Sequence, residues 1–304
     1  WHLAYNLTAH LPETPEPQKT LHPKYKKRLG PKEEWYYIAA DFLLDGIRKN
    51  PRTYQLYFDL GYAIYEVKLD DHANAVKYLK EARRYKHDRW VPRMLYLAMW
   101  RNGQYDDAIE GWLEYLESDP GNLTAERFLK INQAYLAEAR SDQAADCARA
   151  AREEAERLRA EGAGPDTQAQ IDEAERVARE MTALSQTEWE KAEIIYNGMI
   201  AADEDHIAKA RILRHEALEF AREGRYLEGV MKLELARYEY MDNFDEISNL
   251  MIEMKQQGNI PLLVTEQLAV ERQREAAIYA DPNRVQARRF VECPYGDHED
   301  AAAL

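Results

Sequence analysis

The sequence of 304 residues lacks several features on which whole classes of protein depend. It contains no run of 18 apolar residues, so no segment is predicted to span a membrane. It has no glycine-rich phosphate loop, no serine in a strand–turn–helix elbow and no pair of histidines at metal-binding spacing on one helix. We therefore predict no catalytic residue, no cofactor and no metal.

Cysteine is also nearly absent. The two cysteines, Cys147 and Cys293, do not make a disulfide framework. Cys147 falls among alanines that recur at helical spacing, and we predict that it is a small core residue. Cys293 lies near His298 and several acidic residues, but their spacing fits no structural zinc pattern. A polar tail is the simpler interpretation.

Excess positive charge is missing as well. The net charge of -14 argues against a general nucleic-acid binder, because an acidic chain gains nothing from counterion release along a phosphate backbone. One stretch is an exception: residues 19–32 carry basic side chains and no acid, among them Lys24, Lys26, Lys27 and Arg28. This basic loop is either a solvated loop or a contact to an acidic partner or an anionic membrane surface.

Valine and isoleucine are sparse, whereas Ala, Glu, Leu, Arg and Lys dominate, which predicts an all-α protein. The most regular stretch is Arg89 to Asn122, which is predicted to form two short amphipathic helices around a turn at Gly103. The first helix carries Leu95 and Met99, four residues apart. The second helix has its apolar residues at spacings of four and three, namely Ala108, Trp112 and Tyr115.

A 34-residue unit of this kind resembles a tetratricopeptide (TPR) repeat. The matching positions are an aromatic residue after the turn, a small residue at the helix crossing, a bulky residue and a terminal proline, which here are Tyr105, Ala108, Trp112 and Pro120. Two positions depart from the pattern: Pro92 replaces an aromatic residue, and Tyr96 replaces a glycine or alanine. The resemblance implies a binding scaffold and does not identify its partner.

Residues 1–122 are expected to form a solenoid of three such repeats. The first repeat has a helix at 1–11, a proline- and lysine-rich insertion at 12–34, and a partner helix at 35–50. The second repeat occupies residues 53–88, and its turn is about two residues longer than the family norm. Because the chain opens on Trp1 in apparent mid-helix, we expect residues to precede it, with a membrane anchor among the alternatives.

Residues 123–202 are expected to form a long antiparallel helical hairpin, like a coiled coil. Alanines recur along 123–161 at spacings of four and three, glycines and a proline break the helix near 165, and a second helix is expected from 166 to about 201. Residues 203–280 are predicted to hold a TPR-like repeat and a terminal helix pair, and 281–304 an irregular tail. The acidic run at Asp203–His206 falls where a helix should start, and acids there complement the helix dipole.

The resemblance also implies a concave groove, because the first helix of each TPR repeat lines the inner surface. Large aromatic residues and arginines are the types that carry binding hot spots, and the guanidinium fork suits carboxylates. The implied groove residues are Phe58, Tyr62 and Tyr65; Trp90, Arg93, Leu97, Trp100 and Arg101; and Arg211, Arg214 and Arg222. Each aromatic residue has the alternative of packing against neighbouring helices.

We therefore expect a non-enzymatic scaffold or assembly subunit that binds other protein subunits or peptide segments in this groove. The alternative is a sensor module that binds a small acidic ligand or peptide through the arginines. The chain also resembles bacterial TPR proteins tethered by an N-terminal membrane helix, which leaves a membrane-associated and a cytoplasmic location open. The sequence does not fix the oligomeric state.

Overall fold

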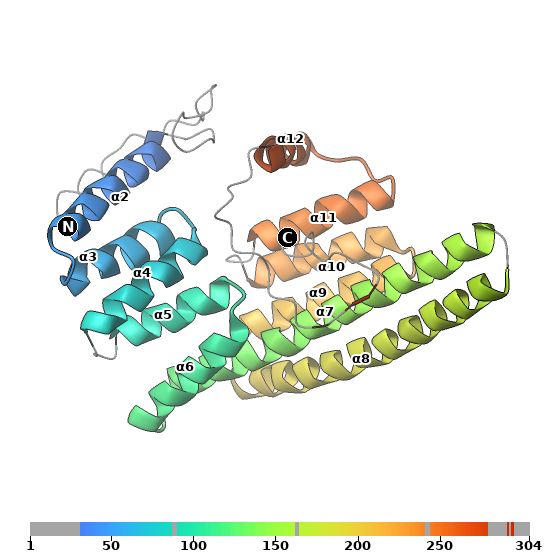
Figure 1. The fold of residues 1–304 in the computed structure, drawn as a ribbon, viewed down its shortest axis with the longest axis horizontal. Coiled ribbons are helices and arrows are strands. Elements are labelled where there is room, and N and C mark those ends of the chain that lie inside the picture. The colour runs from blue at the N-terminus through green and yellow to red at the C-terminus, as the bar shows by residue number, and fades with distance from the viewer. Residues whose placement is uncertain are drawn as a thin grey trace. The chain divides into compact units, whose positions relative to one another are not determined.

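The computed structural model describes residues 31–86, 90–161, 164–240 and 244–278, together with 291, 293 and 294. Its regular structure is helical throughout, with no strand in these residues, which confirms the all-α prediction for them (Figure 1). The helix expected at 1–11 and residues 19–30 of the basic loop lie outside the described residues. Among the helices that are described, none is long and apolar enough to cross a membrane.

The chain divides into two compact units. Unit 1 takes in the described residues up to 129 and the second half of the last helix, from 271. Unit 2 takes in residues 130–270 and the described positions from 291 onward. The first boundary falls inside a helix rather than in a linker, a few residues after the boundary expected at 122.

Unit 1 contains α2 (Pro31–Lys49), α3 (Tyr54–Phe58), η1 (Asp59–Glu66), α4 (His72–Tyr85), α5 (Trp90–Arg101) and α6 (Tyr105–Ser118). From α3 to α6, each helix packs against the next one in the chain. The core is formed by large side chains such as Leu60, Leu79, Leu95 and Trp112, all of which are buried. Helix α4 therefore contacts both η1, which precedes it in the sequence, and α5, which follows it.

Two boundaries in unit 1 differ from the sequence analysis. Pro31 was expected in the proline-rich insertion, yet it opens α2, because proline is well suited to the first turn of a helix, where its missing N–H costs nothing. The helix expected from residue 53 continues from α3 into η1, which is a π-helix. Eight residues in this form are uncommon, because π-helices mostly occur as single turns. The longer turn that follows is made by Asp70, which adopts a left-handed backbone with φ of 52°.

A close contact between α5 and α6 explains how Tyr96 is tolerated where the repeat pattern has a small residue. The Tyr96 ring is buried and lies against Gly111, where a Cβ atom would come within 2.2 Å of a ring carbon. Glycine on the second helix therefore provides the space that a small residue on the first helix would otherwise provide. Large and small residues have exchanged sides of the helix crossing.

Unit 2 is built on two helices of 39 residues each, α7 (Leu123–Glu161) and α8 (Pro165–Asp203), the first of which begins in unit 1. They lie side by side and meet through small side chains. Ala151, Ala155 and Ala174 are buried at this seam and expose no more than 1% of their surface. Alanine permits the two backbones to approach closely over several turns.

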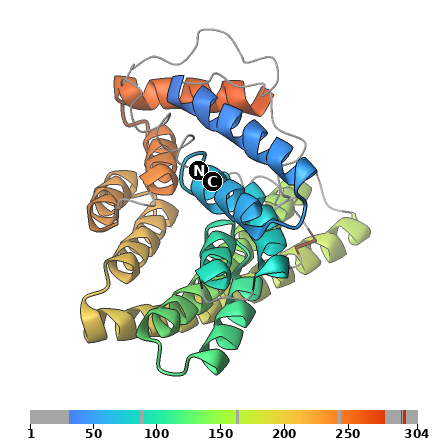
Figure 2. The same ribbon diagram turned by 90° about the vertical axis from the view of Figure 1, so that its left-hand side faces the viewer.

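The rest of unit 2 consists of α9 (His206–Arg222), α10 (Tyr226–Glu239), α11 (Phe244–Gln257) and α12 (Val264–Ile278), which ends in unit 1. Helices α9, α10 and α11 pack in sequence order (Figure 2). Their shared core includes buried Leu233, Ile247 and Met251. The expectation for the acidic run holds for Asp205, whose side chain caps α9 and accepts a hydrogen bond of 3.1 Å from the Ala208 amide. It does not hold for Asp203, which ends α8, or for Glu204, which follows it in a left-handed conformation.

Candidate partner-binding surfaces

In unit 1, the predicted groove residues of α5 share one helix face. At 100° per residue, Trp90, Arg93, Leu97 and Arg101 fall within about 80° of the helix circumference. Trp90 is 50% exposed, Arg93 and Leu97 are half-buried, and the Arg101 side chain is 39% exposed. We call these four residues the α5 face. It combines an indole, an aliphatic side chain and two guanidinium groups.

The other predicted aromatic residues serve mainly as packing groups. Tyr65 is buried and stacks on Tyr78 with ring centroids 5.5 Å apart. Trp100 is buried and its ring meets that of Phe128 at 5.8 Å. Phe58 and Tyr62 are half-buried and contact each other at 5.5 Å. Tyr65 and Trp100 therefore pack against neighbouring helices, which was the alternative to a place in the groove.

Arg101 is held by an ion cluster rather than left open for a ligand. Its Nη1 lies 3.1 Å from Oε1 of Glu66, which is buried, and Oε2 of Glu66 lies 2.9 Å from Nδ1 of His72. Burial alone would lower the pKa of His72, but hydrogen bonds with Asp70 and Glu66 outweigh it and raise the pKa to about 9. His72 is therefore charged at neutral pH, and Glu66 is neutralised from two sides.

Arg93 is the other arginine of the α5 face. Its Nε is buried without a hydrogen bond. A buried guanidinium N–H that makes no bond is costly. Unlike Arg101, Arg93 has no carboxylate partner among the described residues, which makes it the arginine of this face that could bind one.

In unit 2, Arg211 and Arg214 are internal residues and not groove residues. Both guanidinium groups are buried and bind Glu138, which is 1% exposed. The distances from their nitrogens to Oε1 of Glu138 are 2.8 and 3.0 Å. Oε2 of Glu138 accepts a further bond of 2.8 Å from the Tyr196 hydroxyl. This set joins α7, α8 and α9.

A second carboxylate on α11 completes the cluster. Glu246 lies 2.7 Å from Arg211 and 2.8 Å from Arg214, and Arg214 also reaches Asp142 at 2.9 Å. Burial would raise the pKa of Glu246, but the two arginines lower it to about 2. Two cations thus face three carboxylates, which leaves no positive surplus for an acidic ligand. We call these five residues, together with Tyr196, the Glu138 cluster.

The remaining predicted site residues add less to a candidate binding surface. Arg222 forms an ion pair with Glu219 on its own helix. The basic loop residues Lys24, Lys26, Lys27 and Arg28 lie outside the described residues. In the described part of the chain, no group of three or more His, Cys, Asp or Glu side chains could hold a metal ion. Cys147 is buried as predicted, but it is bonded to Cys293, a pairing that the sequence analysis did not foresee.

The sequence analysis also missed an exposed apolar stripe on α10. Leu227, Met231, Leu235 and Tyr238 are between 55% and 86% exposed and fall within about 80° of the helix circumference. We call them the α10 stripe. The opposite side of α10 is equally apolar and packs into the core through Val230, Leu233 and Ala236. The signal in the sequence was a helix that is apolar on two opposite sides.

Charged pairs border the α10 stripe. Arg225 binds Glu228, and Arg237 lies 2.6 Å from Glu234. Lys232 lies 2.5 Å from Glu216 of α9. An apolar centre within a ring of polar groups is the usual anatomy of a protein–protein interface.

Comparison with known proteins gives no match to this chain among family models, curated proteins or solved structures.

Proposed function

We propose that the chain is a TPR-type helical-repeat scaffold, or an assembly subunit, that binds other proteins and carries out no catalysis. The α10 stripe is the observation that carries this proposal. Four large apolar side chains on one helix face exceed what an isolated surface helix needs, and contiguous patches of this kind mark interaction sites. Packing of α3 to α6 and of α9 to α11 in sequence order supports the repeat interpretation.

The α5 face is the proposed groove for a peptide segment. Trp90 offers an exposed indole for an apolar side chain, and Arg93 offers a guanidinium beside it. Leu97 extends the apolar part of the same face. A segment that carries an apolar residue next to an acid would match this arrangement. The long helices α7 and α8 complete the proposed architecture as a hairpin inserted between repeats.

The alternative function, a sensor of a small acidic ligand, has narrower support. Arg101, Arg211, Arg214 and Arg222 are already bound to carboxylates, so the alternative rests on Arg93. A ligand that binds only the folded state raises the melting temperature of the lone chain. A rise on adding a dicarboxylate, lost in Arg93→Glu, would favour the sensor over the scaffold.

Affinity capture of the full-length protein from its native source tests the scaffold proposal. We expect a stoichiometric polypeptide partner. Leu235→Glu should lose it if the α10 stripe is the contact, whereas Leu113→Glu, the same change at a leucine of similar exposure on α6, should keep it. Absence of any partner from all samples would contradict the proposal.

A second pair of variants tests the α5 face. Arg93→Glu should weaken binding of a partner segment in the groove, and Arg84→Glu on α4 controls for the same change of charge at an exposed position outside the α5 face. Arg101→Glu is unsuitable, since it would leave buried Glu66 facing a second carboxylate. If Arg93→Glu bound the partner segment as well as wild type does, the α5 face would not be the binding groove. The α10 stripe would then be the remaining proposed contact.

A further inference from the structure

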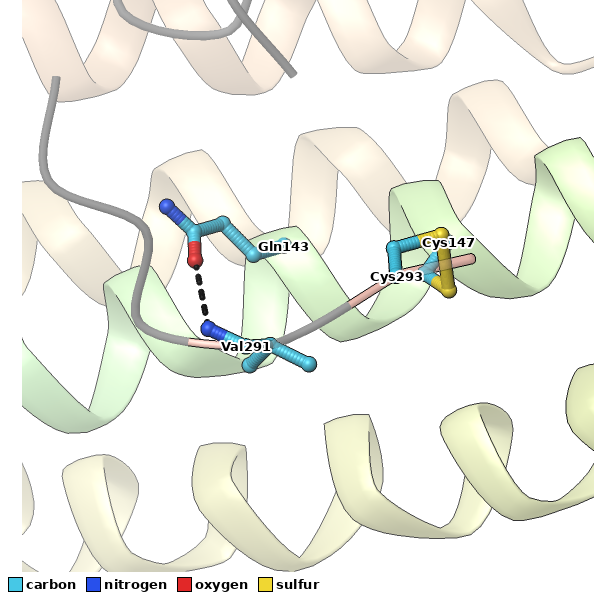
Figure 3. Close-up of a disulfide and its surroundings, with 4 residues drawn as sticks. All are labelled: Gln143, Cys147, Val291 and Cys293. Carbon is cyan, nitrogen blue, oxygen red and sulfur yellow. Dashed lines mark hydrogen bonds between the residues drawn. A yellow bond between two sulfur atoms is a disulfide. The ribbon is translucent and has the colours of Figure 1, made fainter. Parts of the chain in front are cut away.

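The two cysteines of the chain form a single bond that attaches the C-terminal region to the middle of α7. Cys147 and Cys293 are 146 residues apart, with Cα atoms separated by 5.4 Å, and no free cysteine remains (Figure 3). A second attachment lies one helical turn earlier: the Val291 amide donates a hydrogen bond of 3.0 Å to Oε1 of Gln143. Val291 and Cys293 are therefore attached to α7 at two points one helical turn apart.

The sulfur pair lies over the seam between the two long helices. Cys147 is fully buried in a cluster with Ala151, Val177 and Ala178, and Cys293 packs against this cluster from the tail. Cys293 is itself half-buried. Its removal would uncover part of an apolar seam, so the tail segment shields the seam as well as being held by it.

We propose that the Cys147–Cys293 bond is a strap that holds Val291 and Cys293 on α7, and that the chain works with the strap closed in an oxidising compartment. Disulfides form and persist in oxidising compartments and are rare where thiols are kept reduced. Every cysteine of the sequence is used in this one bond, and the Cys147 side is shielded from attacking thiols by burial. Shielded disulfides resist reduction.

Closure is a thiol–disulfide exchange that needs an external disulfide, either a small one or that of an oxidoreductase. The Cys293 thiolate, on the more accessible side, attacks one sulfur of this oxidant and releases one thiolate. The Cys147 thiolate then attacks Cys293 Sγ in the mixed disulfide and releases the second thiolate. The two cysteines lose two electrons and two protons, and the oxidant is reduced to two thiols. A dithiol reductant reverses both steps and frees residues 291–294.

Mass spectrometry of the full-length protein tests the resting state of the bond. Thiols are blocked with N-ethylmaleimide in cells of the native source before lysis, and the protein is digested with trypsin without reduction. Trypsin cuts after Arg140, Arg149 and Arg289, so a closed strap joins peptide 141–149 to the peptide that begins at Phe290. We expect this linked pair to dominate. Blocked Cys147 and Cys293 in most molecules would overturn the proposal.

Hydrogen–deuterium exchange and thermal unfolding test whether the bond acts as a strap. Wild type treated with a phosphine reductant and untreated Cys293→Ser should both lose protection at residues 291–294, while α7 and α8 stay protected. Because the bond closes a large ring, the melting temperature should fall by roughly 10 °C in both samples. Reductant should change nothing further in Cys293→Ser. Unchanged protection and unchanged melting in reduced wild type would overturn the strap.

Discussion

The Glu138 cluster permits a prediction that can be worked through atom by atom. In Glu138→Gln one carboxylate oxygen becomes an NH₂ group. Each oxygen accepts two bonds: Oε1 from Arg211 and Arg214, and Oε2 from Arg211 and Tyr196. Turned toward Arg211 and Arg214, the NH₂ group faces two donors and two bonds are lost. Turned toward Arg211 Nε and Tyr196, it loses one bond, because the tyrosine hydroxyl can turn and accept. In both cases one negative charge disappears from a buried site.

The size of the expected destabilisation follows from the charges that stay buried in the variant. Removing one partner of a buried ion cluster costs about 3–5 kcal/mol, because the facing cations stay buried with less compensation. One or two lost bonds to charged groups, at about 1.5–3 kcal/mol each, give a similar figure. Tyr196→Phe removes a single bond to Glu138 and should cost about 1–2 kcal/mol. Glu153→Gln, at an exposed position on α7, should cost almost nothing.

Scanning calorimetry measures the effect, and hydrogen–deuterium exchange locates it. We expect Glu138→Gln to lower the melting temperature of unit 2 by roughly 10 °C, since about 1 kcal/mol corresponds to about 2–4 °C in a unit of this size. Peptides of α7, α9 and α11 should lose protection first. If Glu138→Gln had the same melting temperature as the Glu153→Gln control, the cluster would not be buried and ion-paired as described.

Two further predictions concern unit 1. Gly111→Ala should lower the free energy of unfolding by about 1–3 kcal/mol, because the added Cβ would overlap the Tyr96 ring. This loss should be smaller in a Tyr96→Leu background, and urea titrations measure it in both. Equal losses in the two backgrounds would disprove the contact. The pKa of His72 is raised to about 9 in the folded state, above an unfolded value near 6.5. Protonated His72 therefore stabilises the folded state by about 2–3 kcal/mol. This contribution is complete below pH 6.5 and is lost as the pH rises through 9. His72→Gln should therefore destabilise the protein at pH 6 and hardly at pH 10, and a pH-independent difference would exclude this role.

Local features of the fold were predictable because they depend on neighbours in the sequence. The alanines at spacings of four and three along α7 indicate a close helix seam, and they are buried there. Asp205 is followed by the first turn of a helix and caps it. Gly103 adopts the positive φ of 68° that a tight turn between two helices requires. Each of these inferences needs only a window of a few residues.

Contacts between distant residues were beyond the reach of this reasoning. Arg211 and Arg214 have the composition of a binding surface, but their partner Glu138 is more than 70 residues away, and nothing in the spacing connects them. The pairing of Cys147 with Cys293 spans 146 residues. Both depend on which helices pack together, which is a property of the tertiary structure.

The α10 stripe lies between these two cases. The apolar residues at 227, 231, 235 and 238 are visible in the sequence, but so is a second apolar set at 229, 230, 233 and 236. The sequence does not reveal which set faces the core. Since the second set is buried against α9 and α11, the first is the set left exposed.

The central claim, that this chain binds another protein through its helix faces, is tested most directly by hydrogen–deuterium exchange on the complex captured from the native source. The measurement compares deuterium uptake of the complex with that of the lone chain. The account predicts slower uptake in α10, with a second footprint on α5 if a segment occupies that face. Uptake that is the same in both samples across α5 and α10 would contradict it.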